Sequence, residues 1–233
     1  MPSSKLQPDS SSDTTSDNNY KLVVLISGSG KNLQAIIDNI EVGNIKATIA
    51  AVISNRADAY GLKRAEKSGI EAKVLDHTKY DSREAFDEEL QSLIDSYSPD
   101  LIILAGFMRI LSDHFVEHFT GKMINIHPSL LPLYKGLHTH QRALADKQTE
   151  HGASVHFVIP ELDAGKVIIQ GIVDVKEDDD EESLANRVHQ IEHQIYPHAV
   201  KILAEGQLEY NAGEVLYDNK PMLTPLKKQL INS

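Results

Sequence analysis

The sequence predicts an α/β fold: an open, mainly parallel twisted sheet with helices on both faces and an antiparallel extension in the C-terminal half. The first observation is that residues 22–26, 47–54 and 101–105 are continuous apolar runs, which are typical of strands buried on both faces. The second is that helical patterns alternate with these runs, as in parallel strands joined by crossover helices. The third is that residues 153–159 and 167–175 are two strand patterns joined by a turn, which predicts a hairpin that extends the sheet.

The first half of the chain is expected to alternate regularly between strands and helices. A helix follows the first strand and is expected to have four apolar residues on one face, Leu33, Ile36, Ile37 and Ile40. Asp58 is expected to cap a second helix, and Gly69 is expected to end it. The next predicted elements are a short strand, a helix and a further strand, at residues 73–75, 82–94 and 122–126.

The second half ends in a long helix and a small hairpin. The helix is expected over residues 183–205 and contains Pro197, a residue that kinks helices. The acidic run 177–182 before it reads as a solvated loop that favours the start of the helix. Residues 208–217 predict a terminal hairpin. We therefore expect three parts: a disordered tail over 1–19, a single domain over 20–218, and a loose C-terminal segment over 219–233.

Composition narrows the class of protein. The 233 residues include no Cys, which excludes disulfides, thiolate metal sites and a cysteine nucleophile. The formal net charge of −11 disfavours a nucleic-acid partner, because such partners are usually met by basic surfaces. No run approaches the ~20 apolar residues of a membrane span, and the N-terminus lacks the apolar core of a secretory signal. We expect a cytoplasmic protein with small-molecule partners, no nucleic acid, no membrane, and a monomeric or homodimeric state.

A glycine-rich loop joins the first strand to the first helix. Residues 27–32 read Ser-Gly-Ser-Gly-Lys-Asn, and such a loop at a helix N-terminus exposes N–H groups to an anion. A P-loop is excluded because Leu25 stands where its first Gly is required, and a dinucleotide fingerprint is excluded because Leu33 replaces the third Gly. The loop is either a phosphate site or an ordinary tight turn, and the loop alone leaves both readings open.

The segment 125–132, Asn-Ile-His-Pro-Ser-Leu-Leu-Pro, carries the strongest chemical signal. Asn125 and His127 point to the same side of a strand, and Pro128 ends that strand. A carboxamide can donate to a developing oxyanion, and an imidazole can move protons near neutral pH. Asp163 lies in the turn of the later hairpin. If that hairpin packs beside the Asn–His strand, the Asp163 carboxylate orients the His127 ring, but the sequence does not establish this proximity.

Other histidines are open to a metal-binding reading. The pair His138 and His140 has a spacing that suits zinc, and His189, Glu192 and His193 match the inverted zincin pattern. The first pair has His151 and His156 nearby, but it lies beside a Gly in a loop and belongs to no zincin motif. The second set has no clear third ligand, and a pattern this short arises by chance. We therefore expect no metal, and we read the helix carrying His189 as a polar face that either meets a ligand or only solvent.

Taken together, these motifs resemble the phosphoribosylglycinamide formyltransferase family of the monofunctional bacterial type. The resemblance runs from about residue 22 to about residue 217 and is carried by the segments 26–33, 104–111, 125–132, 136–140, 152–156, 161–163 and 192–193. It implies a Rossmann-like formyltransferase fold. It also implies transfer of a formyl group from 10-formyltetrahydrofolate, the co-substrate, to the amine of glycinamide ribonucleotide in de novo purine biosynthesis.

The resemblance also implies roles for individual residues. The catalytic set would be Asn125, His127 and Asp163. The substrate-binding set would be Gly30, Lys31, Asn32, Gly106, Pro128 and Glu192. The folate-binding set would be Arg83, Phe107, Met108, Arg109, Ile110, Leu111, Val116 and His156. One departure is visible, because members of the family often carry a small Ser or Thr where Lys31 stands.

Rival readings remain at this stage. A formyltetrahydrofolate hydrolase would use the same Asn, His and Asp with water in place of the amine, but it usually carries an additional N-terminal domain. A methionyl-tRNA formyltransferase would carry a further C-terminal domain and a basic surface. A non-catalytic folate- or nucleotide-binding module would bind without turnover, and a dehydrogenase is disfavoured by the incomplete dinucleotide fingerprint.

Overall fold

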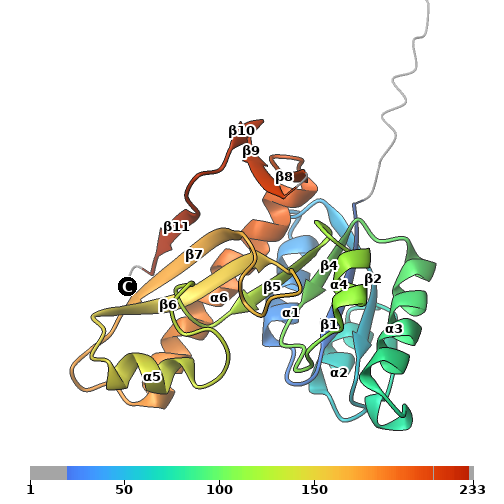
Figure 1. Cartoon of the computed structure of the whole chain (residues 1–233), viewed down its shortest axis with the longest axis horizontal. Coiled ribbons are helices and arrows are strands. Elements are labelled where there is room, and N and C mark those ends of the chain that lie inside the picture. The colour runs from blue at the N-terminus through green and yellow to red at the C-terminus, as the bar shows by residue number, and fades with distance from the viewer. Residues whose placement is uncertain (1–19, 212, 231–233) are drawn as a thin grey trace, which may run out of the picture.

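The computed structural model describes residues 20–211 and 213–230, and there strands and helices alternate as predicted (Figure 1). The main sheet contains β1 (Tyr20–Ile26), β2 (Ala47–Ser54), β3 (Ala72–Val74), β4 (Leu101–Leu104), β5 (Met123–His127), β6 (Glu150–Phe157), β7 (Val167–Asp174) and β11 (Leu226–Gln229). Their order across the sheet is β11-β7-β6-β5-β4-β1-β2-β3. Strands β1 to β5 pair in parallel, whereas β6 runs antiparallel to both β5 and β7. The predicted fold class is confirmed.

Helices cover both faces of this sheet. They are α1 (Lys31–Glu41), α2 (Tyr60–Lys67), α3 (Arg83–Tyr97), α4 (Asp113–His118), α5 (Thr139–Ala145) and α6 (Glu181–Ala204), with a short 3-10 helix η1 (His77–Lys79). One buried cluster joins the sheet to α1, α2 and α6, and a second joins it to α3 and α4. Figure 1 shows α6 crossing β6 and β7, against which it packs directly. No helix of the described residues is long and apolar enough to cross a membrane.

The helix starts show one side-chain cap and correct the cap that was expected. Ser82 caps α3, because its hydroxyl accepts the Ala85 N–H at 3.1 Å. Asp58 does not cap α2. The N-cap is Ala59, which makes no side-chain cap hydrogen bond, and the Asp58 carboxylate instead binds Arg56 at 2.7 Å. The neighbouring guanidinium is a stronger partner for this carboxylate than backbone N–H groups are.

The C-terminal part is more ordered than expected. The hairpin of residues 208–217 is confirmed as β8 (Leu208–Asn211) and β9 (Glu214–Tyr217), and β10 (Lys220–Pro221) completes a small antiparallel sheet. The expectation of a loose segment over 219–233 is wrong for its described part, because β11 joins the main sheet beside β7. The expected tail, residues 1–19, lies outside the described residues.

Candidate functional site

The two residues that dominate the sequence motif lie at the carboxyl end of β5. Asn125 stands opposite His156 of β6, and His127 stands opposite Ser154. Directly opposed residues of antiparallel strands project from the same face of a sheet. The antiparallel β6 therefore places two more polar side chains next to the predicted pair. In an open α/β sheet, this is the edge at which ligands bind.

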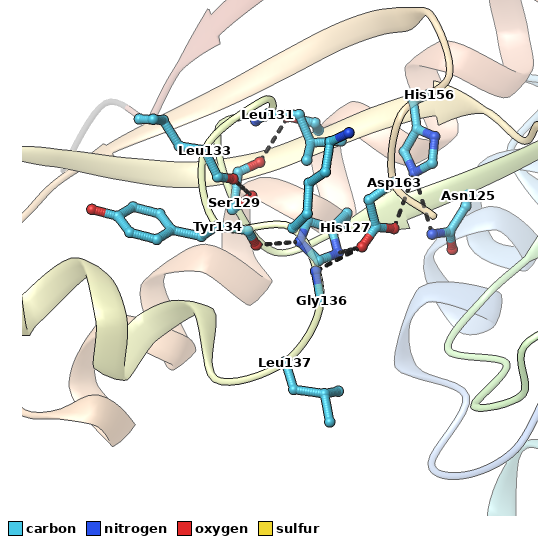
Figure 2. A network of polar contacts seen from close by, with 12 residues as sticks. Asn125, His127, Ser129, Leu131, Leu133, Tyr134, Gly136, Leu137, His156 and Asp163 are labelled. Atoms are coloured by element: carbon cyan, nitrogen blue, oxygen red, sulfur yellow. Dashed lines mark hydrogen bonds and ion pairs between the residues drawn. The ribbon is translucent and has the colours of Figure 1, made fainter. Parts of the chain in front are cut away.

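His127 is buried and contacts an oxygen atom with each ring nitrogen. Its Nε2 donates to the backbone carbonyl of Tyr134 at 2.9 Å, and its Nδ1 lies 3.4 Å from Oδ2 of Asp163 (Figure 2). Because carbonyl and carboxylate oxygens accept hydrogen bonds, both nitrogens are satisfied when both carry protons. The ring is thus held by two oxygen atoms, one beside each nitrogen.

Asp163 lies between the two histidines, as Figure 2 shows. It sits in the turn between β6 and β7 at a φ of 49°, and its side chain is buried. Its Oδ2 accepts the Gly136 N–H at 2.9 Å, and its Oδ1 lies 3.8 Å from Nε2 of His156. The proximity to His127 that the sequence left open is therefore present.

Asn125 is half-buried and faces His156. Its Nδ2 lies 3.3 Å from Nε2 of His156, and Nδ1 of His156 lies 2.8 Å from the Phe157 carbonyl. His156 is 2% exposed, and this burial lowers the pKa of its ring. The Asn125 carboxamide therefore lies beside a buried imidazole.

The loop after β5 is held by side chains of β6 and β7. The Ser154 hydroxyl donates to the Ser129 carbonyl at 2.7 Å and accepts the Leu131 N–H at 3.0 Å. Gln170 of β7 donates to the Leu131 carbonyl at 2.8 Å. Ser154 lies two positions before His156, so its facing was readable from strand alternation. The Tyr134 contact was not readable, because it is made by a backbone group.

The glycine loop and α6 form a second cluster. Gly30 is the N-cap of α1 with a left-handed φ of 68°, and Lys31 and Asn32 follow it as the first helical residues. The Asn32 Nδ2 donates to Oε2 of Glu192 at 3.0 Å. Burial raises the pKa of Glu192 to about 7, and the Asn32 hydrogen bond opposes that shift. Gly106 turns the chain just after β4, and its carbonyl accepts the Ser27 N–H at 3.1 Å.

The predicted folate residues divide into exposed and buried ones. Met108 and Ile110 are 73% and 64% exposed, whereas Phe107, Leu111 and Val116 are buried in the core cluster against α3 and α4. The Met108 N–H already donates to the Ser27 hydroxyl at 2.8 Å, so it is engaged within the chain.

The two predicted arginines lie on or against α3, and Pro128 lies in the loop after β5. Arg83 is the first residue of α3 and pairs with Glu84 at 3.1 Å. The Arg109 guanidinium lies over the Phe86 ring of the same helix, 4.9 Å from its centroid. Pro128 is half-buried beside His127. Within residues 20–211 and 213–230, no group of three or more His, Asp or Glu side chains is arranged to hold a metal ion.

Comparison with known proteins connects this geometry to a family. The family model described as Formyl transferase matches residues 20–200. The phosphoribosylglycinamide formyltransferase of Escherichia coli (strain K12) is 52% identical over 199 residues, which cover 85% of this chain and 94% of that protein. This chain belongs to the phosphoribosylglycinamide formyltransferase family. The predicted family, its formyltransferase activity and its place in purine biosynthesis are thereby confirmed, and membership implies a formyl-folate co-substrate.

A solved structure and a longer relative support the same family assignment. A solved structure of the phosphoribosylglycinamide formyltransferase from Coxiella burnetii has a TM-score of 0.86 and 51% identity, and the match covers 90% of this chain and 99% of that one. The trifunctional purine biosynthetic protein adenosine-3 of Homo sapiens is 46% identical over 189 residues, which cover 81% of this chain but 19% of that protein. The formyltransferase unit therefore also occurs within longer proteins.

Proposed function

We propose that this formyltransferase moves the formyl group of 10-formyltetrahydrofolate to the primary amine of glycinamide ribonucleotide, giving formylglycinamide ribonucleotide and tetrahydrofolate. The observation that supports it best is the contact of His127 with Asp163 beside the Asn125 carboxamide, at the ligand-binding edge of a formyltransferase sheet.

The chemistry follows from the three side chains. The amine attacks the formyl carbon, a C–N bond forms, and the carbonyl oxygen becomes negative. The Asn125 NH2 group and a protonated His127 stabilise that oxygen, and one preorganised donor of this kind contributes ~3 kcal/mol. For His127 to do so, its Nε2–H turns from the Tyr134 carbonyl toward the substrate.

A proton transfer completes the reaction. The bond from the formyl carbon to the folate nitrogen breaks, and the proton lost by the attacking amine reaches that nitrogen. His127 gives its proton to the folate nitrogen and takes up the proton lost by the amine, or a water held by Asp163 carries the proton between them. Asp163 keeps the imidazole oriented and compensates its charge. No covalent intermediate with the protein is required.

The second cluster supplies the binding site for the ribonucleotide. The phosphate would lie at the N-terminus of α1, where Gly30, Lys31 and Asn32 offer N–H groups and the Lys31 charge. Glu192 would accept from a ribose hydroxyl, and Gly106 and Pro128 would border the glycinamide part. The exposed Met108 and Ile110 side chains, with backbone groups up to Leu111, would meet the pterin, and Arg83 and Arg109 the glutamate carboxylates.

The test is to follow deformylation of 10-formyltetrahydrofolate spectroscopically, with and without glycinamide ribonucleotide. We expect deformylation that requires the ribonucleotide and is lost in His127→Ala. Deformylation without the ribonucleotide would indicate a hydrolase, and folate binding with no deformylation in either sample would indicate a binding module.

The variant Asp163→Asn tests the carboxylate in the same assay. We expect turnover to fall by about 100-fold or more, because general acid–base groups contribute on that scale and an amide cannot compensate the imidazolium charge. Thermal unfolding of the variant should stay cooperative. Near-normal turnover would remove Asp163 from the mechanism.

A further inference from the structure

The backbone carbonyl of Phe157 fixes the tautomer of His156. Nδ1 of His156 lies 2.8 Å from this oxygen, and a carbonyl oxygen can only accept. Nδ1 must therefore carry the hydrogen. Gly165 packs against the same carbonyl, where a Cβ at position 165 would lie 1.8 Å from the oxygen. The turn that carries Asp163 thus closes over the acceptor and holds it in place.

The tautomer of His156 in turn decides how the Asn125 amide lies. A neutral ring with its hydrogen on Nδ1 presents a lone pair at Nε2. Nδ2 of the Asn125 carboxamide lies 3.3 Å from this Nε2. Only its NH2 edge forms a hydrogen bond there, because the oxygen edge would set two acceptors against each other. The Phe157 carbonyl, acting through His156, therefore fixes which edge of the Asn125 amide faces the ring.

We infer that His156 is a positioning residue, which holds the Asn125 carboxamide with its NH2 group turned inward so that the second N–H of that group can meet the developing oxyanion. This inference rests on the proposed function, in which Asn125 is the oxyanion donor. It replaces the folate-binding role expected for His156 from the family resemblance. The His156 ring is 2% exposed and has a partner at each nitrogen, so it offers little surface for contact with a ligand.

The surroundings of His156 keep the ring neutral. Burial lowers its pKa, the Phe157 hydrogen bond and the Asp163 carboxylate raise it, and His127 lowers it, with a net downward shift. A second proton on the ring would go to Nε2, which lies 3.8 Å from Oδ1 of Asp163. Asn125 would then have to turn its carboxamide oxygen toward Nε2, and its NH2 group would leave that position.

The direct test is NMR of the full chain labelled with ¹⁵N-histidine at pH 7.5, with the His156 signals identified by their loss in His156→Gln. We expect one protonated nitrogen, assigned to Nδ1, and one unprotonated nitrogen at Nε2. A hydrogen on Nε2, or on both nitrogens, would overturn the inference. This measurement needs no turnover, so it is independent of the proposed function, which fails separately if the wild type does not transfer formyl groups.

The kinetic test compares His156→Leu, which cannot accept a hydrogen bond, with His156→Gln, which can. We expect His156→Leu to lower kcat by roughly tenfold to a hundredfold, less than removal of the donor itself, with little change in either KM. His156→Gln should recover part of the loss. Added to Asn125→Ala, His156→Leu should cost little more, because both changes remove one interaction. Fully additive losses, or a raised folate KM at unchanged kcat, would contradict the positioning role.

Discussion

Glu192 illustrates how a single residue can favour binding at the expense of stability. Its side chain is buried on α6, and its pKa is about 7 against an ordinary value of 4.5. Between these two values the folded protein binds more protons at this site than the unfolded chain does. The contribution of Glu192 to the free energy of unfolding therefore falls as pH rises from 4.5 to 7, and this loss persists above pH 7. The charged form of Glu192, the proposed contact of the ribose, thus destabilises the folded protein when no ligand is bound.

The variant Glu192→Gln should separate the two effects. We expect an unfolding temperature above that of the wild type at pH 8, with no gain at pH 5, because the amide has no charge to desolvate. We also expect the KM for glycinamide ribonucleotide to rise by about tenfold or more, the cost of losing a hydrogen bond to a charged group. Glu88→Gln, which removes an exposed carboxyl on α3, is the control. If Glu192→Gln had a lower unfolding temperature than the wild type at pH 8, the buried charge would not be destabilising.

At this scale the sequence indicates side chains better than it indicates their partners. Asn125 and His127 were predictable because alternation along a strand puts them on one side. The approach of Asp163 was not, because it depends on how far the β6–β7 turn folds back over β5. The Tyr134 carbonyl had no signal in the sequence, since any residue has a carbonyl.

Among the elements, the turn between β6 and β7 packs tightly against the strand before it. It carries Asp163 and packs Gly165 onto the Phe157 carbonyl. A methyl group at position 165 would push this turn away from β6. Both the Asp163 carboxylate and the acceptor for His156 would then move.

We therefore expect Gly165→Ala to lower turnover by about tenfold or more and to destabilise the fold by ~1–3 kcal/mol, as overpacking does. Urea unfolding and the formyl-transfer assay measure the two effects. Lys166→Ala changes an exposed side chain of the same turn and keeps the backbone contact of residue 166 with Phe157, so it should alter neither. An unaffected Gly165→Ala would show that the turn tolerates displacement.

The elements that were not predicted have too weak a local sequence pattern to be recognised. Helices α4 and α5 span six and seven residues, too few turns for an apolar period to emerge. Strand β11 reads Leu-Lys-Lys-Gln, which has no strand alternation, and its place is set by the distant edge of β7. The buried strands were predicted because short, continuous apolar runs are typical of strands that are covered on both faces.

Over the whole molecule, buried histidines make the fold sensitive to acid. His151 is 1% exposed, and its Nε2 lies 3.1 Å from Nδ1 of His140. Burial, with smaller effects of His140 and His127, lowers the pKa of His151 to about 4, and burial also lowers the pKa of His140. The unfolded chain then binds more protons than the folded one below pH 6.5.

We expect the free energy of unfolding to fall as pH drops from 6.5 toward 4, by up to about 1.4 kcal/mol per pH unit for each proton excluded. Urea unfolding at pH 7.5, 6 and 5 measures the slope, and His151→Gln should flatten it. The control His114→Gln alters an exposed ring on α4 and should leave the slope unchanged. Equal slopes in all three proteins would contradict this account.

Strand β11 has a consequence for solubility. It forms the outer strand beside β7, whose sequence Val-Ile-Ile-Gln-Gly-Ile-Val-Asp is mostly apolar, and it presents Lys227 and Lys228 to solvent. Charged lysines on an edge strand discourage pairing with the sheet of another molecule. A chain shortened to residue 218 would make β7 the outer strand and offer an apolar edge to its neighbours. Strand β11 thus acts against aggregation by covering the edge of β7.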